Sequence, residues 1–263
     1  MIELIFEILF GTIFDIIYII LGAIFGSFST FVGYRLFNED KKNYSLLGIH
    51  SKCCNCGHNL KVIDLIPIIS FILLKGKCRY CKKPIPAWHF IAELFCSFSF
   101  VYSIKIFNGI NYQSILFITI CICLCIQSIT DIRKMVSSDI IHIIIFICSF
   151  MLSNSFGYTY KQSLLTFFFI FVFFISLTFL MKILLKKDCL GFGDIKLFSS
   201  LSMVFSIEQF ALFIGFTGIF GIIFFIIREK MFKTNNNKKE IPYIPIITFA
   251  FLLAFYFKVK NLL

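Results

Sequence analysis

Residues 163–181 read SLLTFFFIFVFFISLTFLM, an apolar run of 19 residues without a charged side chain. A helix that crosses the hydrocarbon core of a bilayer needs about 20 such residues, so this run is long enough to be a transmembrane helix. The rest of the chain agrees, because 59% of its 263 residues are hydrophobic and the mean hydropathy is +0.92. The alternating pattern of a membrane β-barrel is absent. The sequence therefore predicts an all-α polytopic membrane protein.

Further apolar runs bring the predicted number of transmembrane helices to about eight. They cover residues 13–34, 90–107, 114–130, 140–156, 163–182, 194–206, 209–227 and 242–257. The sixth is shorter than the others. Residues 1–15 contain three acidic residues and no Lys or Arg, whereas a secretory signal peptide starts with a basic region. We therefore expect the first apolar segment to be retained as a helix.

The basic residues predict which ends of these helices face the cytosol. The net charge is +11. If the loop after the first helix is cytosolic, 21 of the 25 Lys and Arg residues lie on the cytosolic side. The exceptions are Lys105, Lys161, Lys258 and Lys260. This asymmetry follows the positive-inside rule. It predicts a multi-pass protein of the cytoplasmic (inner) membrane with most charged loops in the cytosol, and it explains the charge without a nucleic-acid partner.

One segment, residues 37–88, is polar, basic and rich in turn residues, and it contains three of the five prolines. It is too long for a simple connection, so we expect a small cytosolic subdomain. The predicted organisation is a first transmembrane helix (residues 1–36), a cytosolic four-cysteine loop (residues 37–89) and a multi-helix membrane domain (residues 90–263).

This loop contains two pairs of cysteines with the spacing of a metal site. Cys53 and Cys56 form one C-x2-C pair, and Cys78 and Cys81 form a second. Two such knuckles predict a tetrahedral zinc cage of the zinc-ribbon type, with tight turns at Gly57 and after the second pair. Four thiolates leave no position for an activated water, so this zinc would be structural. The alternatives are reduced thiols, disulfides, or Cys54 as a competing ligand.

Other catalytic motifs are missing from the chain. It has no His-Glu-x-x-His of a zinc protease, no Gly-x-Ser-x-Gly of a serine hydrolase and no Walker A sequence. Gly22, Gly26 and either Ser29 or Thr30 are small residues spaced three or four apart. This spacing is typical of a helix-packing face in a membrane, and that interpretation is preferred to a nucleophilic serine.

Two acidic residues at the edges of apolar runs are candidates for chemistry. Asp194 ends the sequence Gly191-Phe192-Gly193-Asp194 at the start of the sixth apolar run, and Asp131 ends the third run. A carboxylate costs about 2.5–3.5 kcal/mol at a helix centre on insertion scales, so one near a bilayer needs a reason. The predicted topology puts both at the cytosolic membrane boundary. A pair that shares one proton supplies a general base and a general acid. The two glycines would allow a tight turn and a close backbone approach.

The alternative for each aspartate is a structural role. An Asp at a helix end is often a cap or the partner of a nearby cation, and Arg133 and Lys196 are close in sequence to the two candidates. Asp139, which follows Ser137-Ser138, is most simply an N-terminal helix cap. From the residues alone, the catalytic pair and these structural roles both stay open.

Several segments, in order along nearly the whole chain, together resemble the type IV prepilin peptidases. They include Gly26–Leu36, the Ser51–Pro86 segment with its four cysteines, Glu93, Asp131 with Asp139 eight residues on, the Gly191–Asp194 tetrad, and the Ile241-Pro242-Tyr243-Ile244-Pro245 sequence before the last helix. The order is more specific than any single segment. The chain departs from the usual pattern at Thr30, Cys54, Ser138 and Phe192.

The resemblance implies a membrane aspartic endopeptidase that removes the basic leader of a prepilin or pseudopilin at the cytosolic face. It implies Asp131 and Asp194 as the catalytic pair, and zinc on Cys53, Cys56, Cys78 and Cys81. It also implies N-methylation of the new terminal residue with S-adenosylmethionine, at a site that no motif identifies. The expected partners are this substrate and membrane lipid, with no nucleic acid.

Three rival functions stay open. The first is a peptidase without the transferase activity, because no Gly-rich S-adenosylmethionine loop is recognisable. The second is a preflagellin or presenilin-like protease, which shares the Gly-x-Gly-Asp sequence but is not expected to carry the four-cysteine loop. The third is a non-enzymatic zinc-ribbon scaffold or transporter, in which Asp131 and Asp194 would be dispensable.

Overall fold

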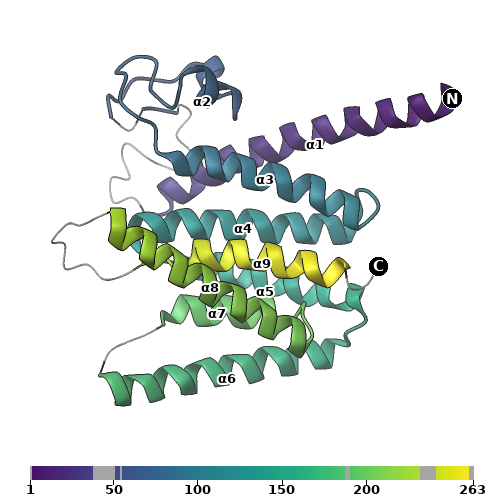
Figure 1. The fold of residues 1–263 in the computed structure, drawn as a ribbon, viewed down its shortest axis with the longest axis vertical. Coiled ribbons are helices and arrows are strands. Elements are labelled where there is room, and N and C mark those ends of the chain that lie inside the picture. Colours follow the sequence, from purple (N-terminus) through teal and green to yellow (C-terminus); the bar gives the residue numbers. More distant parts are fainter. Residues whose placement is uncertain (1, 38–50, 54, 187–189, 232–240, 261–263) are drawn as a thin grey trace. The chain divides into compact units, whose positions relative to one another are not determined.

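The computed structural model describes residues 2–37, 51–53, 55–186, 190–231 and 241–260 (Figure 1). Within these ranges the ordered elements are helical, and the extended pairing consists of two isolated bridges, Lys52 with Asn59 and Lys77 with Pro84. The all-α prediction is confirmed. The chain clusters into two compact units, Met1–Ser114 and Ile115–Leu263, and each is described separately. Cys54, the alternative metal ligand, lies outside the described residues.

In the first unit, α1 (Ile2–Arg35) packs closely against α3 (Ala87–Ile106) (Figure 1). A Cβ on Gly22 would lie 2.5 Å from the Cα of Ser97, and one on Gly26 would lie 2.6 Å from the carbonyl oxygen of Ala92. Only glycine allows the two backbones to come this near. Ser97 also donates a hydrogen bond of 3.0 Å to the carbonyl of Ile19. The predicted helix-packing role is confirmed for Gly22 and Gly26.

The segment between these two helices contains little regular structure. It holds the 3₁₀ turn η1 (Val62–Leu65) and the short helix α2 (Ile69–Leu73). The N–H of Ile68 donates a 2.7 Å hydrogen bond to Glu93 of α3. This bond attaches the segment to the membrane helix beneath it.

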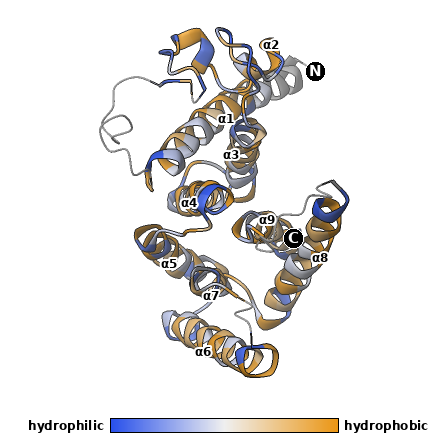
Figure 2. Cartoon of the chain, turned by 90° about the vertical axis from the view of Figure 1, so that its left-hand side faces the viewer, coloured by the Kyte–Doolittle hydropathy of each residue, from blue (hydrophilic) through white to orange (hydrophobic). Residues whose placement is uncertain are grey.

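The second unit is built around a tightly packed aromatic core. The chain continues through α4 (Tyr112–Lys134), which begins at the boundary between the units, and then through α5 (Asp139–Ser153), η2 (Asn154–Phe156), α6 (Tyr160–Leu185), α7 (Phe192–Ser202), α8 (Ile207–Met231) and α9 (Ile244–Lys260). Phe117 of α4 and Phe251 and Phe255 of α9 are fully buried, with the Phe117 and Phe255 ring centroids 4.5 Å apart. Helix α7 lies between α5 and α6, while α8 packs on α9 (Figure 2).

All eight predicted helices are present, and six of them are long and apolar enough to cross a membrane. These six are Gly11–Arg35, Ala87–Ile106, Tyr112–Lys134, Asp139–Phe156, Tyr160–Leu185 and Ile207–Lys230. The other two are shorter: α7 has 11 residues and α9 has 17. At 1.5 Å per residue, α7 is only about 16 Å long, roughly half of the hydrocarbon core. The outer helices α6 and α8 present mainly apolar residues (Figure 2), which suits contact with lipid.

Candidate functional site

The four predicted metal ligands come together in the first unit. The Sγ atoms of Cys53, Cys56, Cys78 and Cys81 all lie within 4.8 Å of one another. Zinc bound at about 2.3 Å from each sulfur places tetrahedral ligands about 3.8 Å apart, and the Sγ atoms of Cys53 and Cys81 are 3.9 Å apart. None of the nine cysteines that the structure describes forms a disulfide. The cluster can therefore hold a metal ion.

The two C-x2-C segments form matching knuckles. Gly57 donates a 2.9 Å backbone hydrogen bond to Cys53, and Lys82 donates one of 3.0 Å to Cys78. Each of these donors has a positive φ, +68° at Gly57 and +60° at Lys82. The predicted tight turns are confirmed, and they direct both members of each cysteine pair toward one point.

A charged pair that the sequence analysis missed holds the second knuckle. Arg79, between the two cysteines of that knuckle, forms a 2.6 Å ion pair with Asp64 of η1. Tyr80 donates a further 3.2 Å hydrogen bond to Asp64. Fifteen residues separate Asp64 from Arg79, so no local spacing signals the contact.

The two candidate catalytic aspartates lie in the second unit, where one approaches the other. Asp131 is in the last turns of α4 and is buried, with 8% of its surface exposed. Asp194 is half-buried in the first turn of α7, outside the six membrane-spanning segments. The pKa of Asp194 is raised to about 7, first by burial and then by the negative charge of Asp131. The two carboxyl groups therefore interact electrostatically.

Asp131 is fixed by the beginning of the last helix. The N–H of Ile244, the first residue of α9, donates a 2.9 Å hydrogen bond to Asp131 Oδ2, and the backbone of Tyr243 is a second hydrogen-bond partner. Free N–H groups at a helix start favour a negative charge. These backbone donors orient the Asp131 carboxyl group and offset part of the cost of burying its charge.

The two glycines of the tetrad make room for side chains. Gly191 is the N-cap of α7 with φ of −70°, and Gly193 does not have a positive φ. Neither glycine therefore adopts the left-handed backbone conformation that favours glycine. A Cβ on Gly191 would lie 3.1 Å from Asp194 Oδ2, and one on Gly193 would lie 2.2 Å from Ser137 Oγ. Gly193 is needed because α7 packs directly on the connection between α4 and α5.

That connection is held by a buried glutamine. Gln127 of α4 donates a 2.9 Å hydrogen bond to the carbonyl of Ser138 and accepts one of the same length from its N–H. His142, one turn into α5, is 4% exposed and has no hydrogen-bond partner on either ring nitrogen. Its Nε2 would lie 3.6 Å from a Cβ on Gly193. Sequence spacing gave no reason to connect His142 with the tetrad.

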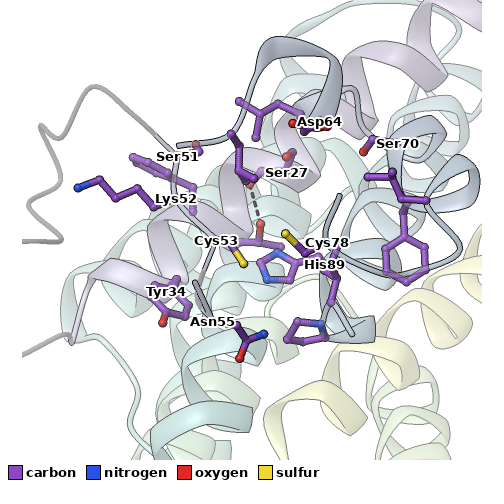
Figure 3. A pocket seen from close by; sticks show the side chains of 18 of the residues that line it. Ser27, Tyr34, Ser51, Lys52, Cys53, Asn55, Asp64, Ser70, Cys78 and His89 are labelled. Atoms are coloured by element: carbon purple, nitrogen blue, oxygen red, sulfur yellow. Dashed lines mark hydrogen bonds between the residues drawn. The ribbon is translucent and has the colours of Figure 1, made fainter. Parts of the chain in front are cut away.

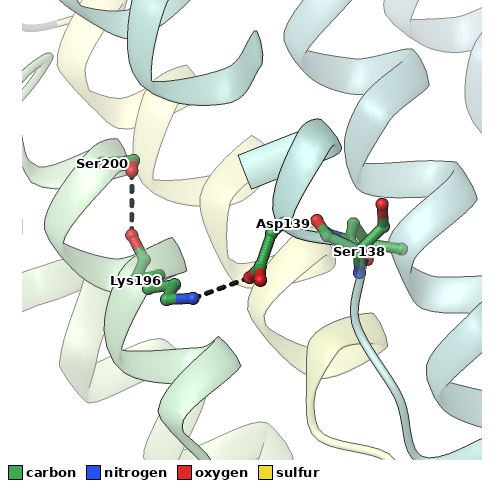
Figure 4. Close-up of polar contacts among 5 residues, drawn as sticks. Ser138, Asp139, Lys196 and Ser200 are labelled. Carbon is green, nitrogen blue, oxygen red and sulfur yellow. Dashed lines mark hydrogen bonds and ion pairs between the residues drawn. The ribbon is translucent and has the colours of Figure 1, made fainter. Parts of the chain in front are cut away.

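Asp139 is an ion-pair partner, and the expectation that it caps a helix is wrong. Ser138 occupies the N-cap position of α5, and Asp139 is the first helical residue. Its carboxylate forms a 2.6 Å pair with Lys196 of α7 (Figure 4). Lys196 also lies over the ring of Phe192, 4.8 Å from its centroid. Lys196 thus joins α7 to α5, and its ion pair is with Asp139 although Asp194 is nearer in sequence.

Comparison with known families gives two matches in order along the chain. Residues 20–107 match the bacterial peptidase A24 N-terminal domain, and residues 118–226 match the type IV leader peptidase family. The first match contains the four cysteines, and the second contains both aspartates.

Similar proteins of known description share one name, prepilin leader peptidase/N-methyltransferase. The one from Vibrio cholerae serotype O1 is 26% identical over 247 residues, which cover 92% of this chain and 96% of that protein. The one from Pseudomonas aeruginosa is 24% identical over 257 residues, covering 90% and 88%. A third, from Dichelobacter nodosus, is 43% identical over 54 residues, 20% of this chain and 19% of that protein. No solved structure gave a match.

Proposed function

This chain belongs to the type IV leader peptidase family, and we propose that it removes the leader peptide of type IV prepilins or pseudopilins by means of Asp131 and Asp194. The observation that carries the proposal is the effect of the Asp131 charge on the pKa of Asp194. The two acids are on different helices of the same unit, 63 positions apart in the sequence. Such a pair supplies the acid and the base that aspartic peptidases use.

The surroundings of the two carboxyl groups suggest their roles. Asp194, with its pKa raised to about 7, is the favoured site for the shared proton. Asp131 accepts a hydrogen bond from the Ile244 N–H, which favours the ionised form. Asp131 then takes a proton from the attacking water while Asp194 gives its proton to the scissile carbonyl. Collapse of the tetrahedral intermediate breaks the C–N bond. The leaving amine takes the proton that Asp131 received from water, and a hydroxyl of the intermediate returns a proton to Asp194.

The membrane setting suggests how the substrate reaches this pair. Six helices of the described chain can span a bilayer. We propose that the protein lies in the cytoplasmic (inner) membrane with its charged loops in the cytosol. A prepilin has one hydrophobic helix, so cleavage at its cytosolic end requires a site at that membrane boundary. The proposed division assigns residues 1–36 to the first transmembrane helix, residues 37–89 to the cytosolic metal-binding loop and residues 90–263 to the peptidase domain.

We assign the four-cysteine cluster to zinc with a structural role. Four sulfur ligands fill a tetrahedral shell, so the ion would hold the two knuckles together and leave the hydrolytic water to the aspartates.

The second activity in the relatives' name is N-methyl transfer, and we propose S-adenosylmethionine as the methyl donor. When bound, it would supply an electrophilic methyl group to the new terminal amine, which would lose one proton to solvent.

The test is leader removal by membranes that contain Asp131→Asn or Asp194→Asn. Each variant should lose cleavage of a prepilin, because the pair then lacks its base or its acid. Asp15→Asn is the matched control, since Asp15 forms an exposed ion pair with Lys105 in the other unit. Normal cleavage by either Asp131→Asn or Asp194→Asn would rule out the pair. Mass spectrometry of the wild-type product then decides between a bifunctional enzyme and a peptidase alone.

A further inference from the structure

Residues 61–77 of the first unit, which contain η1 and α2, expose a group of aliphatic side chains. Five of them are each more than half exposed and form what we call the apolar patch: Val62, Ile63, Ile69, Ile72 and Leu73. Val62 is 82% exposed and Leu73 is 73% exposed. An exposed apolar surface of this kind marks a site that contacts a partner or a membrane. The proposed catalytic pair lies in the other unit and does not use this patch.

The opposite face of α2 is already covered by protein. Ser70 and Phe71 line a cavity of about 210 Å³ that also borders α1 and α3, and Figure 3 shows Ser70 at its wall. Phe71 stacks on Phe90 of α3, with ring centroids 4.8 Å apart. The five residues of the apolar patch take no part in this lining. The patch therefore faces away from the helices that hold α2 in place.

Two contacts with α3 give the depth at which residues 61–77 lie. Helix α3 has 20 residues, enough to cross the bilayer, so its first residue lies near one boundary of the hydrocarbon core. Ile68 donates its 2.7 Å hydrogen bond to Glu93, six residues along this helix. Phe71 stacks on Phe90, three residues along it. At 1.5 Å per residue, these partners are about 9 Å and about 4.5 Å inside the boundary. Amphipathic segments that bind membranes insert to about 5–10 Å, which is the same range.

The backbone of this segment is paired as a membrane boundary requires. Donors to carbonyl groups of the segment itself include the N–H groups of Ser70, Ile72, Leu74, Gly76 and Lys77. A backbone group without a partner is costly away from water, whereas a paired one avoids most of that cost. The segment can therefore enter the boundary region without leaving these groups unsatisfied.

Positive charge flanks the apolar patch. Lys61 precedes η1, Lys75 and Lys77 follow α2, and all three are exposed. Asp64, the acid within the segment, is paired with Arg79 at 2.6 Å. A second copy of this chain would bring the same cations against its own, and the leader of a prepilin is itself basic, so both would be repelled. Anionic lipid headgroups, in contrast, attract such cations.

We propose that the apolar patch inserts into the boundary between headgroups and acyl chains beside α3, with Lys61, Lys75 and Lys77 on anionic lipid headgroups. In the proposed orientation this is the cytosolic leaflet. The metal-binding loop is then attached to the membrane surface through α2 as well as through its two flanking helices. The inference goes beyond the peptidase activity, and its failure leaves that proposal unchanged.

The test places a tryptophan on the patch of the full-length protein in lipid vesicles. The chain has one tryptophan, so Trp88→Phe gives a background without this fluorophore. In that background Ile72→Trp and, separately, Leu73→Trp report from the patch, and Asn59→Trp reports from an exposed position of the same loop. Lipids brominated near the headgroup end of the acyl chains should quench most of the fluorescence of both patch reporters and little of that of Asn59→Trp. Two patch reporters keep the result independent of a folding defect in either one.

The lipid composition tests the choice of partner. Quenching of Ile72→Trp should be stronger in vesicles that contain phosphatidylglycerol, an anionic lipid, than in pure phosphatidylcholine. The double variant Lys75→Gln/Lys77→Gln should remove most of this difference, because each cation near an anionic surface favours binding about fivefold. Lys230→Gln, which removes an exposed cation of α8 in the other unit, is the matched control and should leave the difference unchanged.

Three results would overturn the proposal. The first is patch reporters that are quenched no more than Asn59→Trp. The second is quenching that does not depend on the charge of the lipid. The third is quenching that falls as the protein-to-lipid ratio rises, which would assign the patch to a second copy of the chain.

Discussion

Substitution of Gly193 by alanine tests how the catalytic pair is positioned. In Gly193→Ala, the new Cβ would lie 2.2 Å from Ser137 Oγ and 3.2 Å from Ser137 Cβ. Ordinary contacts begin near 3.4 Å, so either the Ser137 hydroxyl rotates away and its Cβ gives by a few tenths of an ångström, or α7 and the connection before α5 separate by about 1 Å. Overpacking of this kind costs about 1–3 kcal/mol. A shift of about 1 Å in a catalytic group can cost ~100-fold in rate.

Helix propensity predicts the opposite result for the same change. Gly193 lies inside α7 and does not have a positive φ. Alanine there should stabilise an isolated helix by about 1 kcal/mol. We expect the steric effect to dominate because the clash involves a Cβ as well as a rotatable hydroxyl. Gly193→Ala should therefore cleave a prepilin about 10–100-fold more slowly than the wild type.

The control removes the side chain that the added methyl group would meet. Ser137→Gly alone should cleave at nearly the wild-type rate, and the double variant Gly193→Ala/Ser137→Gly should regain most of the lost activity. The assay compares initial rates of leader removal in detergent, at equal protein concentration, for the wild type, the two single variants and the double variant. Wild-type activity in Gly193→Ala, or a double variant no better than the single one, would refute the packing argument.

Three further predictions concern the metal site and the two units. Cys78→Ser should lower bound zinc, measured by elemental analysis, to well under one ion per chain, and full retention would contradict the cage. Gly26→Leu should lower the thermal unfolding midpoint in detergent because its side chain meets the α3 backbone 2.6 Å away, whereas Gly215→Leu has open space and should not. Lys258 is 1% exposed, donates to the Val204 carbonyl and lies 3.7 Å from the centre of the Phe156 ring. Lys258→Ala should lower the free energy of unfolding by about 2–4 kcal/mol, and Lys258→Met should lower it by less. Equal stability of Lys258→Ala and the wild type would contradict this packing.

The sequence predicted features that depend on hydrophobic length or short spacing. Six of the eight predicted helices are long apolar runs, and such a run has few other ways to satisfy its backbone in a membrane. The two cysteine knuckles were also predictable, since each depends on four consecutive residues. The crossing of α1 and α3 followed from the spacing of Gly22 and Gly26.

Contacts between distant residues could not be predicted in this way. The Ile244 N–H that holds Asp131 is 113 positions away, and the Lys196 that pairs with Asp139 is 57 positions away. The cap expected at Asp139 was wrong because a nearby helix offers a stronger, oppositely charged partner. The charge pattern only placed Lys258 outside the cytosolic side. Its position near the rings of Phe156, Tyr158 and Phe205 is indicated by no local pattern.

The central claim is that Asp131 and Asp194 share one site, and carboxyl titration tests it most directly. Protein with ¹³C-labelled aspartate should show one carboxyl that titrates near pH 7 and is absent from Asp194→Asn. Removal of the neighbouring negative charge in Asp131→Asn should lower the pKa of that carboxyl. Because the reaction needs a proton on the pair, wild-type cleavage should fall as the pH rises through about 7. An Asp194 titration that is unchanged in Asp131→Asn would contradict the shared site.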